Sequence, residues 1–259
     1  MSETVVNEIA LNDRPDHRNG AIALVLGASG AIASLLVLPY ALAMTQKAWP
    51  PIGGILVTFG ANFVVIALLA YIGLRAGQRF GLDSPAIRRW LAGASAPPSS
   101  RWILAIVVGI VAAVAAGLLQ AILPLPADAI DVSHIPASWK GLLASFYGGI
   151  VEETAFRLFL VSALVWLATR ILSPRPSVYW TAIVIAAILF GAAHLPNWSA
   201  VSEVPLNPAI VISIISANAV CGIAFGWLFC RYGIEHAIAA HFSTDIVLHV
   251  LLPLIMPQG

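Results

Sequence analysis

The chain has 259 residues, of which 60% are hydrophobic and only 10% are charged, and its mean hydropathy is +0.92. Soluble globular domains carry about a quarter charged residues, so this composition excludes an ordinary soluble domain and indicates a polytopic membrane protein. The net charge of +1 argues against a nucleic-acid-binding surface, and no nucleic-acid partner is expected. We predict a cytoplasmic polar tail at residues 1–19 and a single transmembrane bundle at residues 20–259.

Seven apolar runs are long enough, or nearly so, to cross about 30 Å of hydrocarbon, which takes about 20 helical residues. They lie at about 20–44, 52–74, 102–123, 141–168, 178–194, 208–230 and 234–255. None shows the ten-residue alternating pattern of a β-barrel strand, so the prediction is an all-α bundle of seven spanning helices. The segment 124–139, which contains prolines, leaves room for an eighth, short or re-entrant helix.

The first run resembles a signal peptide, because Arg14 and Arg18 precede it and small residues end it. At about 25 residues it is longer than an ordinary signal core, and we interpret it as an uncleaved spanning helix. The distribution of Lys and Arg among the loops then places the N-terminus inside and the C-terminus outside. The outer loops carry Lys47 and Lys140, and the inner side carries Arg14, Arg18, Arg75, Arg79, Arg88, Arg89, Arg101, Arg170, Arg175 and Arg231.

Ionisable residues within the predicted helices lie only in the second half of the chain. The fourth helix contains three, the fifth ends with one, and the seventh, beyond Glu235 and His236 at its start, contains three: Glu152, Glu153, Arg157, His194, His241, Asp245 and His249. Each such group costs about 2.5–3.5 kcal/mol to insert at the centre of a membrane helix. A cluster on three helices of one chain therefore indicates a shared site in which these side chains face one another.

Helical spacing separates the charges of the "EETAFR" stretch. Glu153 and Arg157 stand at i and i+4 with the acid first, which favours a structural ion pair on one helix face. Glu152 is rotated by about 100° from Glu153 and does not share that pairing. We infer that Glu152 is the carboxylate available for chemistry. The alternative is a structural charge cluster that only fixes helix packing.

Two further stretches, "FGAAH" and "HFSTDIVLH", contain i, i+4 pairs. Phe190 and His194 share a helix face, so the ring is expected beside the imidazole in a pocket; alternatively, His194 is only an interfacial residue at a helix end. His241, Asp245 and His249 form one stripe. Such a stripe can bind a divalent metal or pair a hydrogen-bond donor with an orienting partner. A satisfied polar stripe between helices is the alternative.

A carboxylate and two imidazoles, without a serine or cysteine nucleophile in a motif, point to an activated water. In one route a metal held by the histidines activates the water while Glu152 takes its proton. In the other, Glu152 and His194 polarise the water directly, and His241 and Asp245 donate hydrogen bonds to the oxyanion. Both routes hydrolyse an amide bond.

The three stretches, in order and spacing, resemble the EExxxR, FxxxH and HxxxN/D signatures of the CPBP intramembrane proteases. This family is named for CAAX proteases and bacteriocin-processing enzymes and is also called the abortive-infection family. The resemblance covers about residues 139–252, which would form the catalytic part of the bundle. It implies a membrane-embedded endopeptidase that acts on a peptide or protein substrate in or at the lipid membrane, and we expect a multi-pass protein of a bacterial inner (cell) membrane.

Residue by residue, the resemblance implies that Glu152 is the essential glutamate and that His194 and His241 are its catalytic partners. Asp245 occupies the position often filled by Asn. The family is commonly described as metalloproteases, so a divalent metal, zinc above all, is an expected cofactor with His194 and His241 as candidate ligands. A metal-free glutamate mechanism is also proposed for the family.

Two features fit the resemblance less well. An ionised aspartate accepts but cannot donate as an Asn amide does, so Asp245 suits a metal-ligand or His-orienting role better than an oxyanion-donor role. The predicted topology also directs the cavity toward the outer side, whereas cleavage of prenylated CAAX tails needs access from the cytosol.

Two other classes of function are compatible with the charges. One is a non-catalytic membrane scaffold or immunity-type protein that keeps the motifs for partner binding. The other is a metal- or proton-coupled transporter, since intramembrane Glu, His and Asp also mark ion pathways. The transporter is less favoured because only half of the chain carries polar residues and no repeat of that pattern is evident in the other half. The oligomeric state is not predicted.

Overall fold

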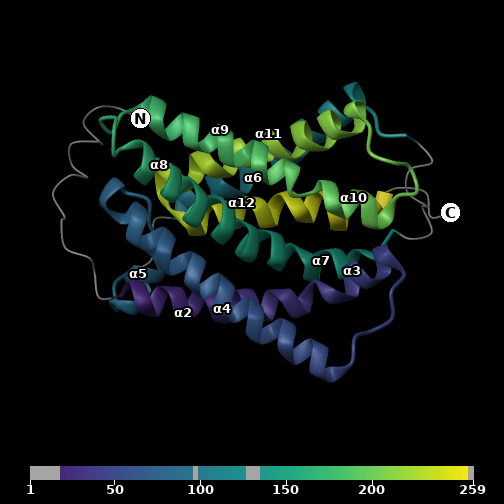
Figure 1. The fold of residues 1–259 in the computed structure, drawn as a ribbon, viewed down its shortest axis with the longest axis horizontal. Coiled ribbons are helices and arrows are strands. Elements are labelled where there is room, and N and C mark those ends of the chain that lie inside the picture. Colours follow the sequence, from purple (N-terminus) through teal and green to yellow (C-terminus); the bar gives the residue numbers. More distant parts are fainter. Residues whose placement is uncertain (1–17, 96–98, 127–134, 256–259) are drawn as a thin grey trace.

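The computed structural model describes residues 18–95, 99–126 and 135–255. Within these ranges every regular element is a helix and no strand is present, which confirms the predicted all-α bundle. The long helices lie side by side, and the chain passes back and forth between the two ends of an elongated bundle (Figure 1).

Six helical segments of the described chain are long and apolar enough to cross a membrane, and they match six of the seven predicted runs. The first three are Asn19–Thr45, Ile52–Phe80 and Arg101–Ile122, and the last three are Pro176–Val201, Pro208–Tyr232 and Ile234–Ile255. Their elements are α2 (Asn19–Leu36) with α3 (Leu38–Thr45), α4 (Ile52–Gly77) with η1 (Gln78–Phe80), α6 (Ser99–Ile122), α9 (Pro176–Ala192) with α10 (Leu195–Val201), α11 (Pro208–Tyr232), and α12 (Ile234–Asp245) with η5 (Ile246–Leu251) and α13 (Leu252–Ile255). The short α5 (Pro85–Leu91) follows η1.

The seventh predicted run is helical from residue 138 to residue 168 but is not uniformly α-helical. It consists of α7 (Ser138–Tyr147), two wider π-helical stretches, η3 (Gly148–Glu152) and η4 (Thr154–Val161), and α8 (Ser162–Ala168). At 1.5 Å per residue it spans about 46 Å, more than the hydrocarbon thickness. We call it the charged rod, after Glu152, Glu153 and Arg157 near its middle. The middle of the segment 124–139, in which an eighth helix was considered, falls on residues 127–134, outside the described residues.

The charged rod lies between two groups of helices. On one side α2 and α4 pack against each other and against the rod, and on the other side α9, α11 and α12 contact it (Figure 1). Gly73 permits the close approach of α4, because a Cβ at this position would overlap the backbone carbonyl of Leu158 in η4. Small residues at such crossings are typical of membrane helix pairs. The charges of the rod must therefore find partners inside the protein.

Local sequence explains where the neighbouring helices begin. Pro208 opens α11, and the Asn207 side chain caps it by accepting hydrogen bonds from the backbone N–H groups of Ala209 and Ile210. Gly233 separates α11 from α12 with a φ of 97°, a conformation that favours glycine. This turn reverses the chain, so α12 runs back beside α11 and carries its polar stripe to the rod.

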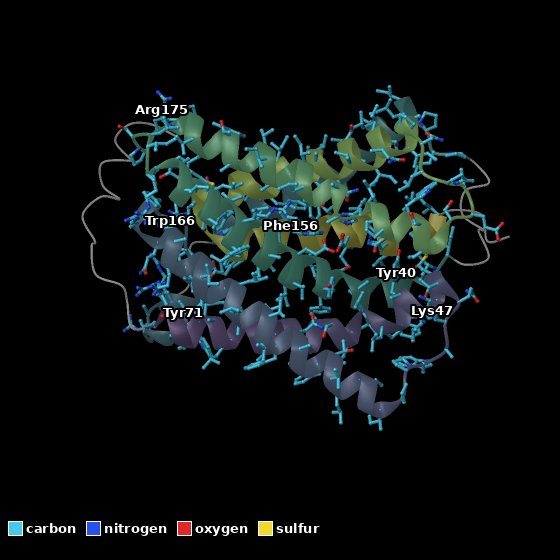
Figure 2. All side chains as sticks on the ribbon, in the orientation of Figure 1. Tyr40, Lys47, Tyr71, Phe156, Trp166 and Arg175 are labelled. Atoms are coloured by element: carbon cyan, nitrogen blue, oxygen red, sulfur yellow. The ribbon has the colours of Figure 1, made fainter. Side chains whose placement is uncertain are left out.

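The loops alternate between the two ends of the bundle in the way the charge distribution requires. Figure 2 shows Arg175, assigned to the inner side, and Lys47, assigned to the outer side, at opposite ends. The orientation of the bundle relative to the membrane stays a prediction.

Candidate active site

The charges of the rod and of α12 meet at one imidazole, that of His241. Its Nδ1 lies 2.7 Å from Glu153 Oε1, and its Nε2 lies 3.8 Å from Glu152 Oε2. The expectation that ionisable residues of different helices face one another holds for these three. Both carboxylates lie close to the same imidazole, whereas the 100° rotation between adjacent α-helical residues predicted that they would point in different directions. Glu153 lies between two π-helical stretches, where the α-helical spacing assumed from sequence does not apply.

Glu153 is engaged on two sides. Arg157 Nη1 lies 3.0 Å from Glu153 Oε1, the same oxygen that accepts from His241. The side chains of Glu153 and Arg157 are 0% and 1% exposed. The guanidinium also lies over the ring of Phe190 at 4.4 Å and over that of Phe225 at 5.4 Å. Two aromatic faces thus enclose the cation, which compensates in part for its removal from water.

Glu152 has a different environment from its neighbour. Its side chain is 23% exposed, and the 3.8 Å to His241 Nε2 exceeds the length of a direct hydrogen bond. Glu152 is therefore the carboxylate of the pair that solvent or a substrate can reach.

The hydrogen bond to Glu153 fixes the orientation of His241. A carboxylate only accepts, so Nδ1 carries the proton and donates it, and Nε2 faces Glu152 and Asp245. Asp245 Oδ1 lies 3.6 Å from this Nε2, and the ring of Phe225 stacks on the imidazole at 4.7 Å with an interplanar angle of 22°. The His241 imidazole is thus fixed by the hydrogen bond at Nδ1 and by stacking on Phe225, and its Nε2 faces two carboxylates.

His194 follows the last turn of α9. Its Nδ1 donates to the carbonyl of Phe190 at 2.8 Å, which leaves Nε2 as the nitrogen available to other groups. The Phe190 ring packs edge-on against His194 at 4.8 Å, which confirms the contact expected from their spacing, and against His241 at 5.8 Å. The Phe190 ring contacts both His194 and His241 and so connects His194 to the other site residues. The hydrogen bond of His194 is to a backbone carbonyl four residues earlier in the chain.

Sequence reasoning missed Gly148 and Phe225. A Cβ on Gly148 would lie 2.5 Å from Asp245 Oδ2 and 2.9 Å from His241 Nε2, so the absence of a side chain at this position leaves room for both groups. The adjacent pair of glycines before the acidic motif was the available signal. Phe225 gave none, because an aromatic residue in an apolar helix is ordinary.

A zinc ion held by His194 and His241 would need further protein ligands near both imidazoles. Among the described residues, no group of three or more His, Cys, Asp or Glu is placed to hold a metal ion. The Nδ1 atoms of both histidines are bonded within the protein, and both Nε2 atoms remain available. The metal stays a prediction from the resemblance.

Residues 134–247 match the model of the family described as Rce1-like, type II CAAX prenyl endopeptidase. No curated protein and no solved structure matches the chain significantly. The matched segment contains the charged rod, His194, His241 and Asp245, and it coincides closely with the part of the chain that carries the three motifs. The predicted resemblance is confirmed over this segment: residues 134–247 are similar to the Rce1-like family of CAAX prenyl endopeptidases, and the chain is an integral multi-pass membrane protein.

Proposed function

We propose that the protein hydrolyses a peptide bond of a membrane-associated substrate through a water activated by Glu152 and His241. The observation that carries the proposal is the contrast between the two glutamates. Glu153 is fully buried and occupied by Arg157 and His241, whereas Glu152 is accessible and faces the remaining nitrogen of His241. The enclosed pair fixes the imidazole, and the accessible carboxylate acts on the water.

The proposed reaction begins with a water that donates one hydrogen bond to Glu152 Oε2 and one to His241 Nε2. A separation of 3.8 Å between these acceptors allows one molecule to bridge them. Glu152 takes a proton as the water oxygen attacks the carbonyl carbon, and it returns that proton to the leaving nitrogen. His194, held through Nδ1, presents Nε2 to the substrate and, when doubly protonated, donates to the oxyanion. Asp245 lies beside His241 Nε2 and, as an ionised carboxylate, does not donate to the oxyanion.

A groove beside the rod supports a lipid-modified or strongly apolar substrate. It has a volume of about 690 Å³ and is lined almost entirely by apolar side chains, with contributions from Trp102, Phe146, Gly149, Ile150 and Phe242. Gly149 and Ile150 belong to the same π-helical stretch as Glu152. A prenyl group or an apolar peptide segment in this groove would lie next to the backbone that carries the proposed base. We propose a CAAX-like prenylated peptide as the first substrate to test.

The first experiment uses the full chain, purified in detergent and reconstituted into lipid nanodiscs. Its substrates are a peptide with a prenylated cysteine followed by three residues, the same peptide without the lipid, and an unrelated apolar peptide. We expect cleavage of at least one membrane-associated peptide, detected by mass spectrometry, and faster cleavage of the prenylated form. Failure of folded wild type to cleave any of them would contradict the proposal and favour the non-catalytic scaffold.

The same preparation tests the metal. Cleavage by protein without stoichiometric metal, in the presence of a chelator, supports direct activation of water by Glu152. Loss of cleavage on chelation, its return with Zn²⁺, and loss of bound zinc in His241→Ala would support the metal route instead.

Replacing Gly148 with alanine is expected to lower kcat by about 100-fold, because its methyl group displaces Asp245 and His241, and displacements of about 1 Å cost this much. Gly60→Ala is the control, since a methyl at Gly60 in α4 would meet nothing within 4 Å. Cleavage rates of the two variants are compared after their folding is checked by thermal unfolding. Equal rates would show that the space at Gly148 does not matter to the reaction.

A further inference from the structure

Tyr40 and His249 meet at the edge of the site, although they are 209 residues apart in the chain. The Tyr40 hydroxyl lies 3.2 Å from His249 Nδ1, and the two rings pack edge to face at 5.4 Å. Tyr40 comes from α3 and His249 from η5, so both lie outside the segment 134–247 that matches the family model. The family match therefore assigns neither residue a role.

The other nitrogen of His249 faces the polar stripe of α12. His249 Nε2 lies 3.9 Å from Asp245 Oδ1, and the same oxygen lies 3.6 Å from His241 Nε2. Asp245 Oδ1 is thus placed between two imidazoles, one of which belongs to the proposed water-activating group. Both separations exceed a direct hydrogen bond and suit a bridging water.

The hydroxyl of Tyr40 selects one arrangement of the His249 ring. If the hydroxyl donates to Nδ1, then Nε2 carries the proton and directs it toward the Asp245 carboxylate. The opposite tautomer would place a lone pair opposite that carboxylate, which is unfavourable. Close backbone packing also fixes the position of His249. Gly141 of α7 lies against the backbone carbonyl of His249, where a Cβ would overlap that carbonyl.

We propose that Tyr40 and His249 are positioning residues that act through Asp245; this inference rests on the proposed function. The N–H of His249 holds the Asp245 carboxylate away from the water that is shared by Glu152 and His241 Nε2. Without that donor, Asp245 competes with Glu152 and His241 Nε2 as an acceptor for the hydrogens of this water.

Tyr40→Phe tests this role with the smallest change, because it removes the hydroxyl and keeps the ring that packs against His249. Loss of a partner that orients a metal-binding histidine typically costs about 10–100-fold, and we expect a similar effect for partners that position Asp245. We expect kcat to fall by about 10–100-fold, with KM and the thermal unfolding midpoint close to wild type. Tyr71→Phe is the matched control, since Tyr71 is 43% exposed on α4 and lies far from Tyr40 along the bundle (Figure 2). It should leave kcat unchanged.

A double-variant cycle separates positioning from simple packing. His249→Ala should lower kcat as Tyr40→Phe does. The double variant Tyr40→Phe with His249→Ala should lose no more kcat than His249→Ala alone. His249→Gln should recover part of the rate, because its amide supplies a hydrogen-bond donor. Wild-type kcat in Tyr40→Phe, additive losses, or a loss fully accounted for by unfolding would overturn the proposal. Activity in Glu152→Gln would overturn the proposed function itself, whereas an inactive Glu152→Gln beside a fully active Tyr40→Phe would overturn only the positioning role.

Discussion

Glu152→Gln is expected to abolish measurable peptide cleavage while leaving the protein folded. Glutamine has nearly the same shape but cannot take a proton from water, and loss of a general base typically costs 10²–10⁴-fold in rate. The carboxylate it replaces is partly exposed and lies 3.8 Å from His241 Nε2, beyond a direct hydrogen bond, so its removal should change stability little. The rate constant is measured with the best peptide substrate, and the unfolding midpoint is measured in the same detergent.

The adjacent Glu153→Gln is the control for this assignment. It removes a charge that is fully buried against Arg157 and bonded to His241, so it should lower the unfolding midpoint as well as the rate. The two glutamates are thus distinguished by stability, even if both variants are slow. Undiminished cleavage by Glu152→Gln would rule out Glu152 as the base.

The sequence could predict the parts of the site that depend on spacing within one helix. The contact of Phe190 with His194 and that of Asp245 with His241 each join residues four apart, and both are present. Such pairs follow from helical geometry alone, whatever the arrangement of the bundle. The same holds for the long apolar segments, because their length is set by the thickness of the membrane.

The parts that depend on how helices pack could not be predicted. Phe225 stacks on His241 from α11, and Tyr40 reaches His249 from the first spanning segment; both are aromatic residues in apolar helices, where they carry no distinguishing pattern. The convergence of Glu152 and Glu153 on one imidazole depends on the π-helical stretches around them. A π-helix leaves no clear trace in hydrophobic periodicity, so the sequence suggested that the two carboxylates diverge.

Arg157→Met should be the most destabilising of the substitutions considered. The guanidinium is 1% exposed, and its removal leaves Glu153 buried with His241 as its remaining ionisable partner. Removing one partner of a buried ion pair costs about 3–5 kcal/mol, because the other charge remains uncompensated. We expect a loss of this size in the free energy of unfolding, measured by denaturant titration in mixed micelles. Arg170→Met is the control, since Arg170 lies two residues beyond the end of the rod, over the ring of Trp166.

A double variant separates the stability of this pair from its part in the reaction. Arg157→Met combined with Glu153→Leu removes both charges, and apolar replacements of a buried pair are often nearly neutral for stability. The double variant should therefore be more stable than Arg157→Met alone and yet remain inactive, because His241 Nδ1 has lost its acceptor. If stability did not recover, the loss in Arg157→Met would reflect the packing between Phe190 and Phe225 rather than an uncompensated carboxylate. Recovery of cleavage in the double variant would show that the reaction does not require the buried carboxylate to orient His241.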